Sequence, residues 1–131
     1  MSSAKSSKKK ILIVEDEPVI SQMCQRVLAG EGFEVEIAVN GKVAQGMIDE
    51  GHYDYCLVDI RTPAMSGIEL YQWLKETHPE LVKKVIFTTG DVMSGDTPAF
   101  LQQAARPFIP KPFTPAELKT IIKQTLAEEE R

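Results

Sequence analysis

Several features are scarce in this 131-residue chain, and each absence narrows the class of protein. There are only two cysteines, Cys24 and Cys56, and their spacing is not that of a metal site, so we expect both to be reduced and structural. No apolar run is long enough to cross a bilayer, and the N-terminus lacks the apolar segment of a signal peptide. We therefore expect a soluble, cytoplasmic protein without membrane contact.

Basic charge and phosphate-binding glycine loops are scarce as well. The chain has 15 lysines and arginines against 19 aspartates and glutamates, a formal net charge of -4. Nucleic-acid binding usually needs a basic face, so we expect no nucleic-acid partner. Neither a GxxxxGKS/T nor a GxGxxG motif is present, which argues against a nucleotide-binding domain.

The length and composition fit one domain with a substantial core. Apolar residues make up 43% of the chain and charged residues 26%, which are ordinary values for a globular protein. Residues 1–9 are polar and basic and are interpreted as a disordered tail or linker. Residues 10–128 are interpreted as the folded domain.

Short apolar runs alternate with helical patterns along residues 10–128. Strands are predicted at residues 11–14, 34–39, 53–58, 85–89 and 107–110. Helices are predicted at residues 18–28, 43–48, 68–77, 98–103 and 115–126. Such alternation indicates an α/β protein whose parallel sheet is covered on both faces. We predict a three-layer, flavodoxin-like (βα)5 fold with a five-stranded parallel sheet of order 2-1-3-4-5.

Charged and hydroxyl side chains stand at the ends of four of these strands. The acidic run 15–17 follows the first strand, Asp59 the third and Lys111 the fifth, and Thr89 ends the fourth. Ligands of open α/β sheets bind beyond the C-terminal strand ends, so we expect these side chains to share one crevice. Carboxylates gathered there repel one another unless a cation is present, and Mg²⁺ is the simplest candidate. Taken alone, the acidic run would be interpreted as a solvated loop that starts a helix. Asp59 and Lys111, each at the end of its own strand, favour the metal site instead.

The four segments ILIVEDEP, CLVDIRTPAMSGIEL, VIFTTGD and PKPF occur in this order, each at a strand end. Together they resemble the receiver domain of bacterial two-component signalling, over about residues 10–126. The resemblance implies a phosphorelay domain that takes a phosphoryl group from a phosphohistidine onto Asp59 with Mg²⁺ as its cofactor. It also implies that the domain catalyses only its own phosphorylation and dephosphorylation, and is otherwise not an enzyme.

By the same resemblance, Mg²⁺ is held by Glu15, Asp16, Asp59 and the backbone carbonyl of Arg61. Asp16 is expected to be the more direct ligand of the acidic pair.

The resemblance also assigns roles around the phosphoryl group. Lys111 pairs with its oxygens, and Thr89 moves to donate a hydrogen bond to it. Pro112 follows Lys111 in a cis peptide. Phe108 is the aromatic switch, which turns inward and changes the surface formed by the helix at 98–103, the strand at 107–110 and the last helix.

Two residues beside the phosphoacceptor suggest a further hypothesis. Arg61 and Asp91 each lie two residues beyond a site residue, Asp59 and Thr89 respectively. We expect them to pair over the phosphoryl group and slow its loss.

The implied phosphodonor is a sensor histidine kinase or a histidine phosphotransfer domain. The implied output is contact with a downstream protein, from a monomer or a weak, phosphorylation-dependent homodimer. Gly90-Asp91 and Arg106-Pro107 depart from the common family pattern and look like receiver modules at the C-terminal end of hybrid sensor kinases.

Two alternatives stay open at this point. A phosphorylation-independent pseudo-receiver would act as an interaction module only. An Asp-nucleophile phosphatase of the dehalogenase type would have a second acid two residues after the nucleophile, where this chain has Arg61.

Overall fold

The computed structural model describes residues 8–90, 92–93 and 95–129, with only the backbone of residue 129. Five parallel strands form one sheet in the order β2-β1-β3-β4-β5, which confirms the predicted flavodoxin-like topology. The strands are β1 (Lys10–Val14), β2 (Glu34–Ala38), β3 (Tyr55–Asp59), β4 (Val85–Thr89) and β5 (Phe108–Pro110).

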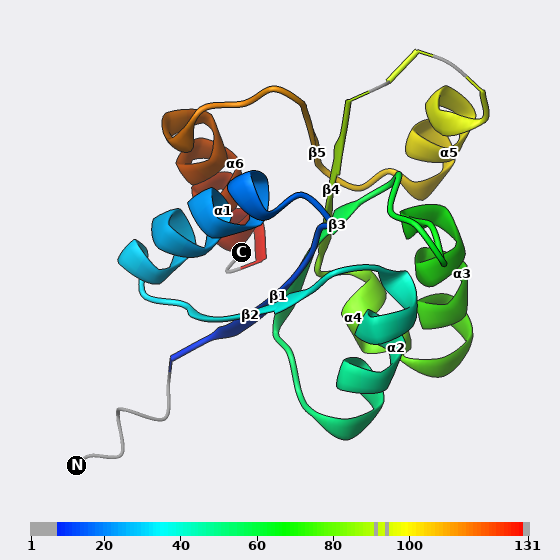
Figure 1. Ribbon diagram of the computed structural model, residues 1–131, viewed down its shortest axis with the longest axis horizontal. Coiled ribbons are helices and arrows are strands. Elements are labelled where there is room, and N and C mark those ends of the chain that lie inside the picture. The colour runs from blue at the N-terminus through cyan, green and yellow to red at the C-terminus, as the bar shows by residue number, and fades with distance from the viewer. Residues whose placement is uncertain (1–7, 91, 94, 130–131) are drawn as a thin grey trace.

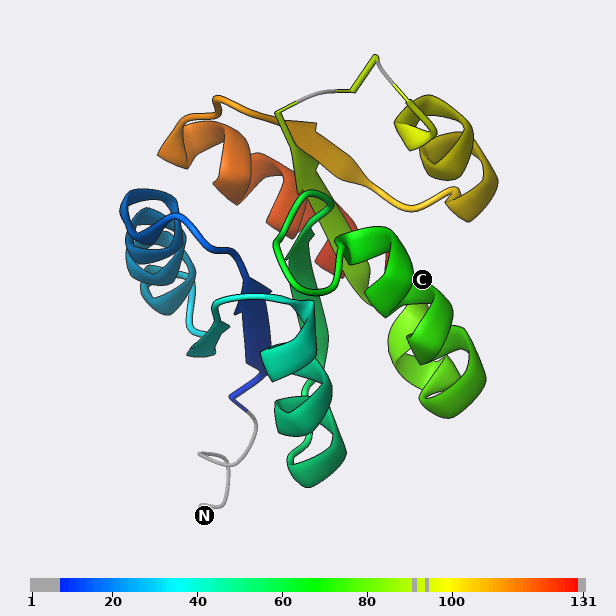
Figure 2. The same ribbon diagram turned by 45° about the vertical axis from the view of Figure 1, so that its right-hand side comes forward.

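Helices cover both faces of this sheet, as Figures 1 and 2 show. On one side lie α1 and α6, and on the other lie α2, α3, α4 and α5. Their bounds are Pro18–Gly30 for α1, Gly41–Glu50 for α2, Gly67–Thr77 for α3, Pro79–Val82 for α4, Thr97–Ala104 for α5 and Pro115–Glu129 for α6. The one-turn helix α4 is absent from the sequence prediction, which has five longer helices.

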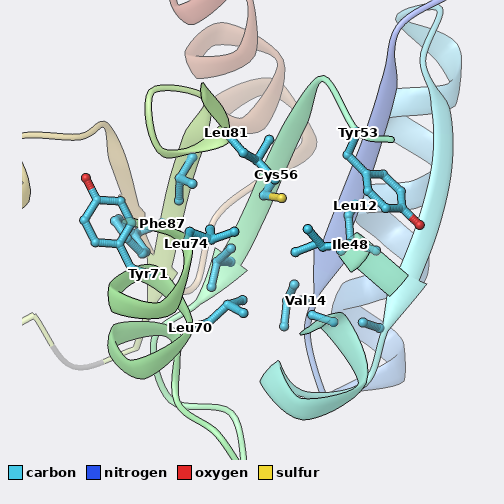
Figure 3. Close-up of a cluster of buried hydrophobic side chains, with 14 of the residues drawn as sticks. Leu12, Val14, Ile48, Tyr53, Cys56, Leu70, Tyr71, Leu74, Leu81 and Phe87 are labelled. Atoms are coloured by element: carbon cyan, nitrogen blue, oxygen red, sulfur yellow. The ribbon is translucent and has the colours of Figure 1, made fainter. Parts of the chain in front are cut away.

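The central strands are buried on both faces, as their apolar runs predict. In β1, Leu12 and Val14 point to the side of α2 and α3, whereas Ile11 and Ile13 point to the side of α1 and α6. All four side chains are at most 1% exposed. Figure 3 shows the first of these two clusters, where Leu70 and Leu74 of α3 pack against the sheet.

The two edge strands are less buried. The alternating strand β2 has one buried residue, Ala38, and Val39 beyond its end is 55% exposed. In β5 only the middle residue, Ile109, is buried, and Pro110 ends the strand at an edge where no further partner amide is needed.

The strand register brings the C-terminal ends of β1, β3 and β4 to one edge of the sheet. Val14 pairs with Val58, Asp59 with Thr88, and Thr89 with Pro110. The residues that follow these positions therefore meet above the same edge. In the part of the chain that the structure describes, no helix combines the length and apolar character needed to cross a membrane.

Candidate active site

The loop that follows β3 is held tightly over the end of that strand. The amide of Gly67 donates to the carbonyl of Ile60 at 2.8 Å, and the Thr62 hydroxyl donates to the Met65 carbonyl at 2.7 Å. The Ile60 amide in turn donates to the Thr88 carbonyl at 2.9 Å. These bonds fix the backbone on both sides of Asp59, the last residue of β3.

Three carboxylates meet at this edge of the sheet. Glu15 and Asp59 are each 3% exposed, whereas Asp16 is open to solvent. One carboxylate oxygen from each residue lies within 4.8 Å of those of the other two. We call this group the acidic cluster; all its ligand atoms are oxygens, the donors that Mg²⁺ prefers.

Lys111 brings positive charge to the acidic cluster. Its amide donates to the Thr89 carbonyl at 2.8 Å, which anchors the end of β5 to the end of β4. Its Nζ lies 3.0 Å from Asp59 Oδ2, 3.1 Å from Glu15 Oε1 and 3.1 Å from Glu17 Oε1. The ammonium is thus surrounded by carboxylates.

Burial and neighbouring charges shift the pKa values of Glu15 and Lys111. Burial and next the charge of Asp59 raise the pKa of Glu15 from 4.5 to about 7, although Lys111 partly offsets both effects. Burial by itself lowers the pKa of Lys111, but its bonds to Asp59, Glu17 and Glu15 outweigh burial and raise that pKa above 10.5. A cation bound at the acidic cluster would relieve the repulsion that raises the pKa of Glu15.

A cleft of about 590 Å³ opens beside the acidic cluster. Asp16, the exposed member of the acidic cluster, lines this cleft together with Arg61, Thr62 and Ser66 of the loop after β3. Residues 95–97, at the start of α5, line it as well. The cleft therefore reaches the acidic cluster at Asp16.

Comparison with known proteins identifies the family of this chain. The family model described as the response regulator receiver domain matches residues 11–123. The chain belongs to the response regulator receiver family.

Individual relatives agree with this family. This receiver domain is 33% identical to the sensor kinase CckA of Brucella abortus, over 92% of this chain and 13% of CckA. It spans about half the length of the first curated relatives that it matches.

Two solved structures are similar over nearly their whole length. A CheY-like receiver domain protein from Methanospirillum hungatei is 34% identical with a TM-score of 0.84, over 95% of this chain and 98% of that one. The response regulator TrrA of Thermotoga maritima, solved in complex with Mg²⁺-BeF, is 32% identical with a TM-score of 0.76, over 89% of this chain and 98% of that one.

The structure brings most of the predicted site residues of this receiver domain together. Glu15, Asp16, Asp59 and Lys111 form the contacts described above. The hydroxyl residue Thr89 is fully buried at the end of β4.

The remaining predicted residues lie around this centre. The amide of Arg61 donates to Asp59 Oδ1 at 3.1 Å, and the peptide bond between Lys111 and Pro112 is cis. Phe108 lies on β5 with 41% of its surface exposed, so its ring faces outward here. Asp91, the expected partner of Arg61, lies outside the described residues.

Glu17 also contacts the site, although the sequence analysis gives this residue no role of its own. It belongs to the acidic run after β1 and directly precedes Pro18, the first residue of α1. A charged residue beside two site acids was a possible signal, but its contact with Lys111, from the loop 94 residues later in the chain, depends on the folded geometry of both loops.

Proposed function

We propose that this receiver domain accepts a phosphoryl group on Asp59 from a phosphohistidine of a sensor kinase or of a histidine phosphotransfer domain. The observation that carries the proposal is the position of the Asp59 carboxylate. It lies 3.0 Å from the Lys111 ammonium and beside the other two acids of the acidic cluster. A carboxylate in this position has a cation to stabilise an incoming phosphate and neighbours that can share a metal ion.

The acidic cluster suits Mg²⁺ as the cofactor. Glu15, Asp16 and Asp59 would hold the ion together with the backbone carbonyl of Arg61, and water would complete its coordination. When bound, Mg²⁺ supplies positive charge that offsets the charge on the acids and on the phosphoryl oxygens. The printed description of the similar TrrA structure, a complex with Mg²⁺-BeF, supports this assignment.

Asp59, Lys111 and Thr89 have separate roles in the transfer of the phosphoryl group. One oxygen of Asp59 forms a bond to phosphorus while the bond between phosphorus and the donor nitrogen breaks. The donor nitrogen keeps the electron pair of that bond, so an imidazole protonated at its other nitrogen leaves as neutral histidine. Lys111 pairs with the transferred oxygens, and Thr89 donates a hydrogen bond to one of them. Phosphoryl transfer needs mainly such positioning and charge stabilisation.

The output of the domain would be a changed surface over α5, β5 and α6. Phe108 is the candidate switch, because its ring is partly exposed on β5 and Pro110 of the same strand pairs with Thr89. When Thr89 turns toward the phosphoryl group, Phe108 would turn inward. A downstream protein would then recognise the altered surface, whether this domain acts alone or, as in the sensor kinase CckA, within a longer chain.

Acetyl phosphate provides a direct test of phosphoacceptance. The protein is incubated with acetyl phosphate and Mg²⁺, and its intact mass is measured. We expect one phosphoryl adduct in the wild-type protein, none in Asp59→Asn and none after chelation of the metal. Asp49→Asn, which changes an exposed aspartate of α2, is the matched control and should form the adduct normally.

The same experiment separates the alternative functions. A wild-type protein without an adduct would favour the phosphorylation-independent pseudo-receiver. Turnover of an added phosphoester would favour the phosphatase. An adduct that persists in Asp59→Asn would place the phosphoacceptor elsewhere.

A further inference from the structure

The ammonium of Lys111 has no donor to spare. A lysine ammonium has three N–H donors, and the Lys111 Nζ lies within 3.0–3.1 Å of three carboxylates, those of Asp59, Glu15 and Glu17. When Asp59 is phosphorylated, its carboxylate becomes an acyl phosphate and loses its charge, so that contact can pass to a phosphoryl oxygen. For Lys111 to give the phosphoryl group a second N–H, either Glu15 or Glu17 has to be released.

The two glutamate contacts differ in how easily they can be released. The side chain of Glu15 is 3% exposed, so its carboxylate would be left buried without its cation, which is costly. The side chain of Glu17 is 59% exposed, so water can solvate its carboxylate as soon as Lys111 leaves. Exposed ion pairs contribute little to stability. Glu17 is therefore the partner that Lys111 can exchange at the lowest cost.

The Glu17 side chain does not cap helix α1, although residue 17 stands at the capping position. Glu17 is the N-cap of α1, and its backbone carbonyl accepts from the amides of Ile20 and Ser21 at 3.1 and 3.0 Å. Its side chain makes no capping hydrogen bond and reaches Lys111 instead. The contact with Lys111 is thus not a by-product of helix capping.

We propose that Glu17 is a positioning residue, which holds Lys111 in the unphosphorylated domain and gives it up to a phosphoryl oxygen when Asp59 is phosphorylated. This inference rests on the function proposed above. Because Glu17 competes with the phosphoryl group for the same ammonium, its carboxylate opposes the phosphorylated state. Loss of that carboxylate should make phosphorylation faster and tighten the binding of fluoroberyllate, an analogue of the phosphoryl group.

The test compares Glu17→Gln with Glu50→Gln, a control that makes the same charge change at an exposed position at the end of α2. Saturating Mg²⁺ is used, because the loss of one negative charge also weakens metal binding. The initial rate of Asp59 phosphorylation is measured with acetyl phosphate and with the less highly charged phosphoramidate. The dissociation constant of fluoroberyllate is measured alongside.

We expect Glu17→Gln to raise the rate with both donors and to tighten fluoroberyllate binding by about two- to five-fold, the range of an exposed ion pair. Glu50→Gln should change neither quantity. A merely structural role of Glu17 would not tighten fluoroberyllate binding. Unchanged or weaker binding, or a rate gain confined to acetyl phosphate, would overturn the inference, since the latter result means simple charge repulsion. A wild-type protein that forms no phosphoryl adduct would instead contradict the proposed function.

Discussion

Gly67, the first residue of α3, lies against the backbone carbonyl of Asp59. A Cβ atom built on Gly67 would stand 2.7 Å from that oxygen and 2.8 Å from the Cα of Ile60. Both atoms belong to the backbone that positions the candidate phosphoacceptor, so they cannot move aside without moving Asp59. The absence of a side chain at residue 67 is therefore part of how the site is built.

We predict that Gly67→Ala destabilises the fold by about 2 kcal/mol, in the range of overpacked core positions, and slows phosphorylation of Asp59. Gly46→Ala on α2 is the matched control, because a Cβ at that exposed helical position meets nothing within 4 Å. It should stabilise the protein by up to about 1 kcal/mol through helix propensity. Urea unfolding measures both changes, and an equal effect of the two substitutions would contradict the prediction.

Glu15 should make the stability of the metal-free protein depend on pH. Its pKa is about 7 in the folded state, mainly because of burial, against 4.5 for an ordinary glutamate. Between these values the folded state holds an additional proton, so the stabilisation from this group is complete below about pH 4.5. It is lost as the pH rises to about 7, and then stays level.

We therefore expect the free energy of unfolding, measured in a chelator, to fall between about pH 5 and about pH 7.5 by more in the wild-type protein than in Glu15→Gln. The difference between the two proteins isolates Glu15 from the other titrating groups. Glu50→Gln should retain the wild-type profile. A parallel decline in the wild type and in Glu15→Gln would show that Glu15 titrates normally.

The arrangement of the strand ends could be predicted from the sequence, and the reason is general. Buried parallel strands appear as continuous apolar runs, and the residues after such runs must share one edge of the sheet. That rule alone brings Asp59, Lys111 and the acidic run 15–17 to the same place, as the structure has them. The rule does not say which of these residues accepts the phosphoryl group. The resemblance to the receiver family indicates that it is Asp59.

Some element boundaries could not be predicted, because tertiary contacts decide them. The third strand begins at Tyr55, two residues later than predicted, since the Asp54 side chain accepts from the Lys10 amide at 2.9 Å. The Tyr53 hydroxyl meanwhile bonds to the Glu36 carboxylate at 2.5 Å. These side-chain contacts fix the segment before the strand, although its apolar character resembles a strand.

Helix α4 and the contact of Glu17 were missed for similar reasons. The helix has only four residues, too few for a periodic pattern, and it forms because Pro79 suits the first helical turn and Leu81 is buried against the core. The strand pattern brings these two loops to one edge of the sheet, but it does not show which of their side chains touch, so the bond between Glu17 and Lys111 could not be predicted.

Both cysteine thiols should be unreactive in the folded protein. Cys24 is 1% exposed and Cys56 is fully buried. Burial raises the pKa of each thiol from 9.0 to about 12, and the charge of Glu15 adds to the effect at Cys24. The reactive thiolate is therefore almost absent at neutral pH.

We predict that a thiol reagent such as DTNB labels neither cysteine of the native protein at about pH 8, and labels both after unfolding in urea. The time course of absorbance measures the labelling. Rapid modification of Cys24 in the native protein would show that α1 opens from the sheet, and would contradict its close packing.

Arg61 is our candidate for slowing the loss of the phosphoryl group. Its amide donates to Asp59, and the residue lines the cleft beside the acidic cluster, through which water would approach. Arg61→Ala should shorten the half-life of the phosphoryl adduct by about two- to five-fold, the range expected for an exposed charged contact. Arg26→Ala, at an exposed position of α1, is the matched control. The decay of the adduct is followed after removal of the donor. An unchanged half-life would show that Arg61 does not slow the loss of the phosphoryl group.

Lys111 should be the main stabilising charge of the metal-free site. Its ammonium separates the buried carboxylates of Glu15 and Asp59, and removal of one partner from a buried ion pair leaves uncompensated charge. Lys111→Met keeps most of the side-chain volume and should cost about 3 kcal/mol when unfolding is measured in a chelator. Lys119→Met, at an exposed position of α6, should cost little.

Magnesium should restore part of the stability that Lys111→Met loses, because the ion would supply positive charge to the same carboxylates. The rise in the unfolding midpoint on addition of Mg²⁺ should therefore be larger in Lys111→Met than in the wild type. Phosphorylation should nevertheless remain slow, since the metal replaces the charge between the acids but not the ammonium that pairs with the phosphoryl oxygens. An equal Mg²⁺ effect in both proteins would mean that the lysine and the metal ion do not neutralise the same charges.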